Sequence, residues 1–134
     1  MNIIGLDGKN YSWIPTNAQC NGIKSKLHLK AKKLLTEMYP NDRILEEVSL
    51  PGTKNSFRKT VLRADLFLPM RKLLIEVHGE QHHKFNNFFF RNKLEFYKAK
   101  ARDNDKKAWC DLNDITLIEL NYNEDIDEWR RKVQ

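Results

Sequence analysis

The sequence contains few of the residues that build disulfide-rich or membrane-spanning proteins. Its 134 residues include two cysteines, Cys20 and Cys110, which cannot form a framework of several disulfides. No segment approaches the roughly 20 apolar residues of a membrane-spanning helix, and the N-terminus lacks the pattern of a secretory signal. These absences predict a protein of the reducing cytoplasm with no membrane partner.

Several short catalytic and cofactor motifs are also missing. The chain has no C-x-x-C pair, no G-x-S-x-G turn and no glycine-rich loop of the kind that cradles phosphates. It has no internal repeat and no low-complexity segment. Nucleophilic triads and nucleotide-binding loops are therefore not favoured.

The composition is that of a globular, basic domain. Hydrophobic residues make up 40% and charged residues 31% of the chain, and the formal net charge is +6. A chain of this length is expected to form one domain, 1–134, with its own core. The excess of lysine and arginine favours a polyanionic partner, and we expect that partner to be DNA.

Apolar periodicity and turn residues predict an α/β fold in which a central mixed sheet is flanked by helices. An N-terminal hairpin is expected around Asp7-Gly8, a strong two-residue turn signal. Ser25 should cap the first helix, Pro40 should end it, and Asn123 should cap the last. The hairpin and its loop occupy 1–24, the core 25–121 and the C-terminal helix 122–134. Helices are expected at 25–39, 92–113 and 124–133, and strands at 43–50, 61–69, 72–77 and 115–122.

Two acids on neighbouring strands form the most informative pattern. Asp65 interrupts one apolar strand, and Glu76 ends the next, so the predicted hairpin brings them together. Paired carboxylates can bind Mg²⁺, with Mn²⁺ as a substitute. His78 should share a strand face with Glu76 and can exchange protons near neutral pH. His82 and His83 follow in the next loop.

Each of these residues also has a structural interpretation. Asp65 could pair with Arg63 or Arg71, and Glu76 could be an exposed acid on a half-solvated strand. A zinc site involving His78, His82 and Cys110 is a further alternative.

Basic and aromatic residues define the expected DNA-binding surface. One group is the loop that carries Lys54, Arg58 and Lys59. A second group lies in the loop and long helix after His78: Gln81, Lys84, Arg91, Lys93, Lys98 and Arg102. The structural alternative is an ordinary solvated helix face. Phe88, Phe89 and Phe90 could wedge between bases or pack beneath the helix.

The segment "DLFLPMRKLLIEVHGEQHH", residues 65–83, resembles the centre of the very-short-patch mismatch repair endonucleases. The same pattern occurs in homing endonucleases named for their E-D-x-H-D residues, and both groups belong to the PD-(D/E)XK nuclease superfamily. The similarity covers about residues 25–121, including the basic helix with "ARDND", and extends to small phage-encoded relatives. It implies a restriction-endonuclease-like core, and a location in the host cytoplasm if the chain is phage-encoded.

The resemblance also implies roles for individual residues. Asp65 corresponds to the metal-binding aspartate and His78 to the first histidine. His83 corresponds by spacing to the second histidine, although His82 is an alternative.

At other positions the correspondence with these nuclease families is less direct. Asp103 corresponds to the acid that supports a histidine, with Asp105 as its neighbour. His28 stands where the repair enzymes have a glutamate, and its structural alternative is a buried, hydrogen-bonded histidine. Asp103 could instead pair with Lys107 along the helix. Glu76 matches the second superfamily acid, which the repair enzymes lack, and His78 falls at the superfamily's lysine position.

The sequence thus predicts a small metal-dependent DNA endonuclease of homing or nicking type that hydrolyses phosphodiester bonds. The alternatives are a non-catalytic DNA-binding module on a degenerate nuclease core and a zinc-bound interaction domain. The sequence leaves open whether the domain forms a homodimer for double-strand cutting or nicks as a monomer, and which DNA sequence it prefers.

Overall fold

The computed structural model describes residues 1–17, 25–79 and 93–134. It confirms the mixed α/β fold, with an antiparallel N-terminal hairpin and a sheet flanked by helices. The hairpin consists of β1 (Asn2–Ile4) and β2 (Asn10–Ser12). The other elements are α1 (Lys26–Met38), β3 (Leu45–Leu50), β4 (Leu62–Leu68), the 3-10 helix η1 (Pro69–Arg71), β5 (Leu73–His78), α2 (Lys93–Leu112), β6 (Thr116–Asn121) and α3 (Ile126–Val133). No helix within the described ranges has the length and apolar character needed to cross a membrane.

The main sheet has the strand order β3-β4-β5-β6. The first two pairings are antiparallel, whereas β5 and β6 are parallel. Parallel neighbours need a crossover connection, and α2 is the helix in that connection. The chain therefore forms a mixed sheet, as the apolar pattern predicts.

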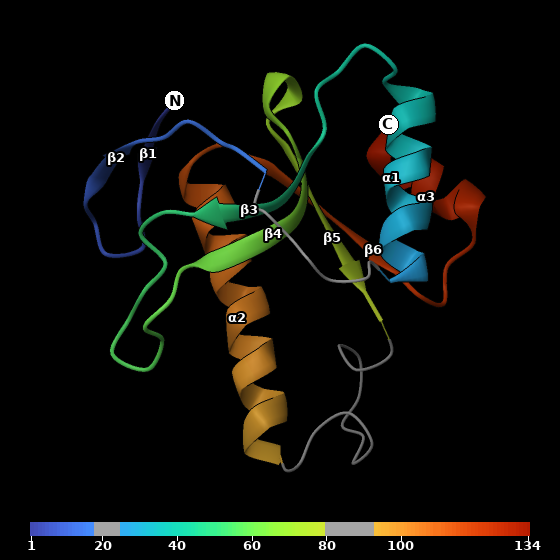
Figure 1. The fold of residues 1–134 in the computed structure, drawn as a ribbon. Coiled ribbons are helices and arrows are strands. Elements are labelled where there is room, and N and C mark those ends of the chain that lie inside the picture. The colour runs from blue at the N-terminus through green and yellow to red at the C-terminus, as the bar shows by residue number, and fades with distance from the viewer. Residues whose placement is uncertain (18–24, 80–92) are drawn as a thin grey trace.

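Helices cover both faces of this sheet (Figure 1). On one face, α2 and the hairpin enclose a core that includes Trp13, Phe67 and Trp109. On the other face, α1 and α3 enclose a second core that includes Leu34 and Trp129. The sheet is thus the middle of three layers, and side chains at its centre can be reached from α1 and from α2.

The first helix forms as its sequence predicts. The Ser25 side chain accepts a hydrogen bond from the His28 backbone N–H, which satisfies one of the free donors of the first turn. The helix ends at Met38, shortly before Pro40. Its buried residues, at positions 28, 31, 34 and 35, recur with helical spacing and fix the face that meets the sheet.

Two local predictions were wrong. The last helix is capped by Asp125, whose carboxylate accepts from the Glu128 N–H, and not by Asn123. In the hairpin, the pairing ends at Ile4 and Asn10, so the turn is longer than two residues. The Asp7 carboxylate accepts hydrogen bonds from the Lys9 N–H and the Tyr11 hydroxyl, and these bonds stabilise the longer turn.

The sheet forks at its centre. β4 pairs with β5 over Leu66–Leu68 and with β3 from Leu62 to Phe67, so the first part of β4 pairs with β3 alone among the described residues. β5 pairs with β6 along its whole length, Leu73–His78. Asp65 and Glu76 are the first residues beyond the β4–β5 pairing, so they stand where the two pairs of strands separate.

Both strands of the β3–β4 pair change face beside this fork. Ala64 and Phe67 pack in the same core although they are three residues apart, and so do Leu45 and Val48. Regular strands place alternate residues on one face, so each strand must be irregular between these positions. Glu47 shows the irregularity directly, because its φ of 53° lies in the left-handed region that non-glycine residues seldom adopt.

Candidate active site at the fork of the sheet

Two side-chain-to-backbone hydrogen bonds join Asp65 to Glu76 and to its neighbour Val77 across the fork. Asp65 Oδ2 accepts from the Val77 N–H at 2.8 Å, and Glu76 Oε2 accepts from the Asp65 N–H at 3.3 Å. The two carboxylates thus replace backbone pairing where β4 and β5 separate. The expected proximity of the two acids is confirmed. Arg71 is not the partner of Asp65, since it pairs with Asp42 at 2.6 Å.

Glu76 is buried, so its interpretation as an exposed acid was wrong. Only 5% of the residue is exposed, and its Oε1 forms an ion pair with the Lys106 ammonium from α2. Burial, and then the charge of Asp65, raise the Glu76 pKa well above its usual range, although Lys106 opposes this. Burial alone would lower the Lys106 pKa, but the acids outweigh it and raise that pKa.

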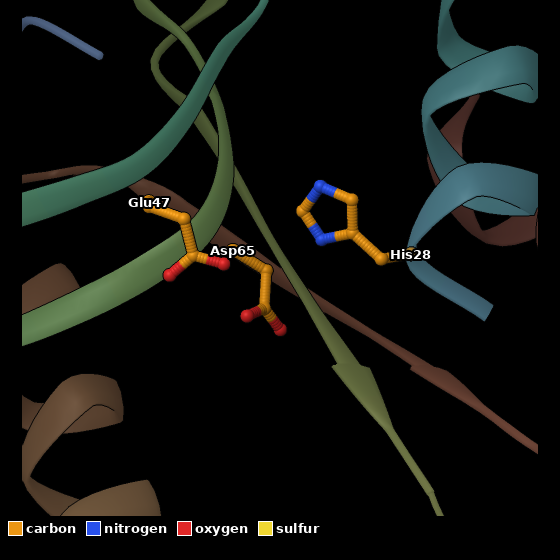
Figure 2. A group of neighbouring side chains, drawn as sticks. All are labelled: His28, Glu47 and Asp65. Carbon is orange, nitrogen blue, oxygen red and sulfur yellow. The ribbon is translucent and has the colours of Figure 1, made fainter. Parts of the chain in front are cut away.

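Three side chains from three different elements form a group that could hold a metal ion. His28 from α1, Glu47 from β3 and Asp65 from β4 each offer a ligand atom, and these atoms lie within 4.8 Å of one another. Figure 2 shows the His28 ring facing the two carboxylates. Asp65 therefore belongs both to this group and to the pair with Glu76.

His28 is held in place by a second acid. Its Nε2 lies 2.9 Å from Glu46 Oε1, and Lys32 Nζ lies 3.0 Å from the other oxygen of Glu46. Partial burial opposes ionisation of Glu46, but the contacts with His28 and Lys32 outweigh it and lower the Glu46 pKa. The buried, hydrogen-bonded histidine is thus confirmed. A carboxylate can only accept, so in the neutral ring that donates Nε2–H to Glu46 the lone pair that can bind a cation is on Nδ1.

Glu47 and Lys106 were not among the residues singled out in the sequence. A signal for Glu47 does exist, since the pair Glu46-Glu47 interrupts the apolar run of β3. Lys106 has no such signal, because it is one cation among many on α2. Lys106 is brought to the site only by the packing of α2 against β5.

His78 lies on the same face of β5 as Glu76, as predicted, and both are buried beneath α2. A hollow of about 230 Å³ brings His78 together with Asp103, Lys107 and Glu119. His78 Nε2 lies 3.6 Å from Glu119 Oε1, and Lys107 Nζ lies 3.3 Å from the same oxygen. Of the two candidate acids on α2, Asp103 therefore lines the histidine hollow.

Asp105 has a different partner. Its carboxylate pairs with Arg58 at 2.7 Å, and Arg58 also donates to the Thr53 carbonyl. Arg58 therefore links the 51–61 loop to α2. The other predicted DNA-binding residues within the described ranges are exposed: Lys54, Lys59, Lys93, Lys98 and Arg102. Other predicted residues lie outside the described residues: His82, His83, Gln81, Lys84, Arg91 and Phe88, Phe89 and Phe90.

Cys110 is a core residue. It packs with Trp109 and Ile115, and burial raises its thiol pKa to about 12. Within the described residues, only one group of three or more His, Cys, Asp or Glu side chains lies close enough to share a metal ion, and it consists of His28, Glu47 and Asp65. Cys110 therefore does not join His78 in a zinc group in the part of the chain that the structure describes.

Comparison with known proteins finds two viral relatives. The chain is 41% identical over 61 residues to uncharacterized protein 307L of Invertebrate iridescent virus 6, and this segment is 46% of the chain and 31% of that protein. It is 38% identical over 69 residues to uncharacterized protein 033L of Invertebrate iridescent virus 3, covering 52% of the chain and 36% of that protein. The chain thus spans about a third of the length of these relatives. No family model and no solved structure matches.

Proposed function

We propose that this protein is a metal-dependent DNA endonuclease that hydrolyses phosphodiester bonds at the fork of the sheet. The observation that carries the proposal is the convergence of three acids from three adjacent strands, Glu47, Asp65 and Glu76, with a buried histidine and a partly buried lysine. Carboxylates crowded in this way repel one another, and a bound cation offsets that repulsion.

The proposed metal ligands are Asp65, Glu47 and His28 Nδ1. This set differs from the pair Asp65 and Glu76, because Glu76 directs Oε1 to Lys106. Carboxylate oxygens suit Mg²⁺ and Mn²⁺, and an imidazole nitrogen favours Mn²⁺ over Mg²⁺. A divalent cation held there would polarise a phosphoryl oxygen and lower the pKa of a bound water.

Lys106 is proposed to stabilise negative charge on the phosphate. Its side chain is 16% exposed, and its ammonium is held at the fork by Glu76. Burial opposes a charged Lys106, but the nearby acids outweigh it and raise the Lys106 pKa, which favours a charge-stabilising role over that of a base. A fixed cation in a site with little water stabilises developing charge more than it would in solvent.

His78 is proposed to exchange protons with water or with the leaving oxygen. It lies two residues beyond Glu76 on the same face, in the hollow with Asp103 and Glu119. An acid beside a histidine orients the ring and stabilises its protonated form. His82 and His83 stay candidates for the same task.

The proposed substrate follows from charge. The exposed cations Lys93, Lys98 and Arg102 lie on α2, the helix that also carries Lys106. Such a row can follow a phosphate backbone into the fork. The similarity of residues 65–83 to PD-(D/E)XK nucleases supports the same substrate, and membership of that superfamily is part of the proposal.

Cleavage of supercoiled plasmid tests the proposal. The wild-type protein should nick or linearise plasmid with Mg²⁺ or Mn²⁺ and do neither with EDTA. Asp65→Asn should abolish cleavage, whereas Asp127→Asn, at an exposed acid of α3, should leave it unchanged. Salt-sensitive DNA binding without cleavage in any divalent metal would instead support a non-catalytic binding module.

A further inference from the structure

A groove of about 440 Å³ lies between α2 and the turn formed by residues 55–58. Three large apolar side chains line it and are nevertheless exposed: Phe57 is 95%, Tyr97 62% and Leu94 60% exposed. Scattered apolar residues are common on surfaces, but three that share one groove indicate a binding surface.

The turn that carries Phe57 is held by hydrogen bonds. Asn55 and Arg58 exchange backbone hydrogen bonds of 3.0 and 3.2 Å, and the Asn55 side chain accepts from the Phe57 N–H at 2.8 Å. The Arg58–Asp105 ion pair fastens this turn to α2. The Phe57 ring is therefore presented from a fixed backbone, which lowers the entropy lost when a ligand binds.

The charges around the groove favour a nucleic acid. Lys98 and Arg102 line the groove, and Lys54 and Lys59 are exposed on the adjoining loop. The acid of the groove, Asp105, is already paired with Arg58. Aromatic rings beside cations match a nucleobase and its phosphates, because the base stacks on the rings while the phosphates meet the cations. A purely apolar partner would leave these cations without counter-charges.

The groove is continuous with the proposed active site along α2. Lys98, Arg102 and Lys106 recur every four residues, so they form one row on the helix surface. At 1.5 Å per residue, Lys98 lies about 12 Å along the axis from Lys106. A strand with one phosphate at the fork can therefore place a neighbouring nucleotide at the groove.

We propose that this groove receives an unpaired nucleobase of the DNA strand, which stacks against Phe57 and Tyr97. The protein then binds DNA with a gap or a bulge more tightly than fully paired DNA. This inference rests on the proposed nucleic-acid substrate, but it does not require cleavage.

Binding without metal separates this inference from catalysis. The probes are a paired duplex and the same duplex with one bulged 2-aminopurine, both in EDTA. Fluorescence anisotropy should show tighter binding of the bulged duplex, and stacking should quench 2-aminopurine. Phe57→Ala and Tyr97→Ala should each weaken bulged-duplex binding about 5- to 100-fold and reduce the quenching. Met70→Ala, at an apolar residue that is 80% exposed between β4 and β5, is the matched control and should change neither.

The outcomes distinguish the two proposals. Bulge preference without cleavage in any metal supports the groove and overturns the endonuclease. Cleavage with no effect of Phe57→Ala or Tyr97→Ala on bulge binding overturns the groove alone. Failure to bind either DNA, together with no cleavage in any divalent metal, overturns both. If Phe57→Ala converts a dimer to a monomer while bulge binding stays unchanged, the groove is a contact between two copies of the chain and the base-binding inference is wrong.

Discussion

Asp65 donates its backbone N–H to the Glu76 carboxylate at the point where β4 and β5 separate, and its own carboxylate accepts from the Val77 N–H. Asp65 thereby has a structural role as well as a proposed catalytic one. Asp65→Ala should lower the free energy of unfolding by about 1–3 kcal/mol, because the Val77 N–H loses its acceptor. Asp65→Asn retains an acceptor oxygen and should cost less stability while still abolishing metal binding. Urea unfolding measures the effect on stability, and calorimetric titration with Mn²⁺ measures the effect on metal binding. Equal losses of stability in Asp65→Ala and Asp65→Asn would contradict the structural role of the Asp65 side-chain oxygen.

His28 should set the metal preference of the site. Its Nδ1 is the only nitrogen ligand in the proposed set, whose other members are Glu47 and Asp65. The wild-type protein should bind Mn²⁺ more tightly than Mg²⁺, and His28→Glu should lower this ratio, since an all-carboxylate set suits Mg²⁺. Competition of Mg²⁺ against Mn²⁺, followed by electron paramagnetic resonance, gives the ratio. If His28→Glu left the ratio of Mn²⁺ to Mg²⁺ affinity unchanged, His28 Nδ1 would not be a metal ligand.

Lys106 should matter for both folding and catalysis. Lys106→Met leaves the buried Glu76 without its ion-pair partner, and we expect a loss of about 3 kcal/mol in the free energy of unfolding. It should also reduce cleavage at least about 100-fold.

A double variant separates these two effects. Lys106→Met with Glu76→Gln removes both charges and should recover most of the stability. If it also recovered cleavage, the proposed charge stabilisation by Lys106 would be wrong.

The contact between α3 and β6 should make stability depend on pH. Glu124 accepts from the Asn121 N–H and pairs with Lys132 at 2.7 Å. Partial burial opposes ionisation, but these contacts outweigh it and lower the Glu124 pKa below its ordinary value of 4.5. The stabilisation is therefore complete above about pH 4.5 and is lost as the pH falls through the folded-state pKa.

Glu124→Gln tests this linkage. The wild-type protein should exceed the variant by about 1 kcal/mol at pH 7, a modest value because the contact is partly solvated. The difference should shrink in urea unfolding between about pH 5 and pH 3. If the stability difference between the two proteins instead grew as the pH fell, folding would raise the Glu124 pKa and not lower it.

Much of the fold could be predicted because its signals are local. Ser25 and Pro40 delimit α1, and the proximity of Asp65 to Glu76 follows from one short connection between neighbouring strands. The Glu46-Glu47 pair is visible in the sequence, but the strand irregularity that directs Glu47 to the site is not, because no glycine or asparagine marks its left-handed backbone. The contacts of Lys106 with Glu76 and of Arg58 with Asp105 join residues 30 or more positions apart. Only the packing of α2 across the sheet determines such pairs.

A crystal structure of the protein with Mn²⁺ tests the central claim most directly. Anomalous scattering locates manganese without reference to any catalytic assay. The account predicts a peak within bonding distance of His28 Nδ1, Glu47 and Asp65, and no peak at that position in crystals of Asp65→Asn. A protein that binds Mn²⁺ elsewhere, for example in the hollow beside His78, or that leaves the fork empty at saturating Mn²⁺, would contradict it.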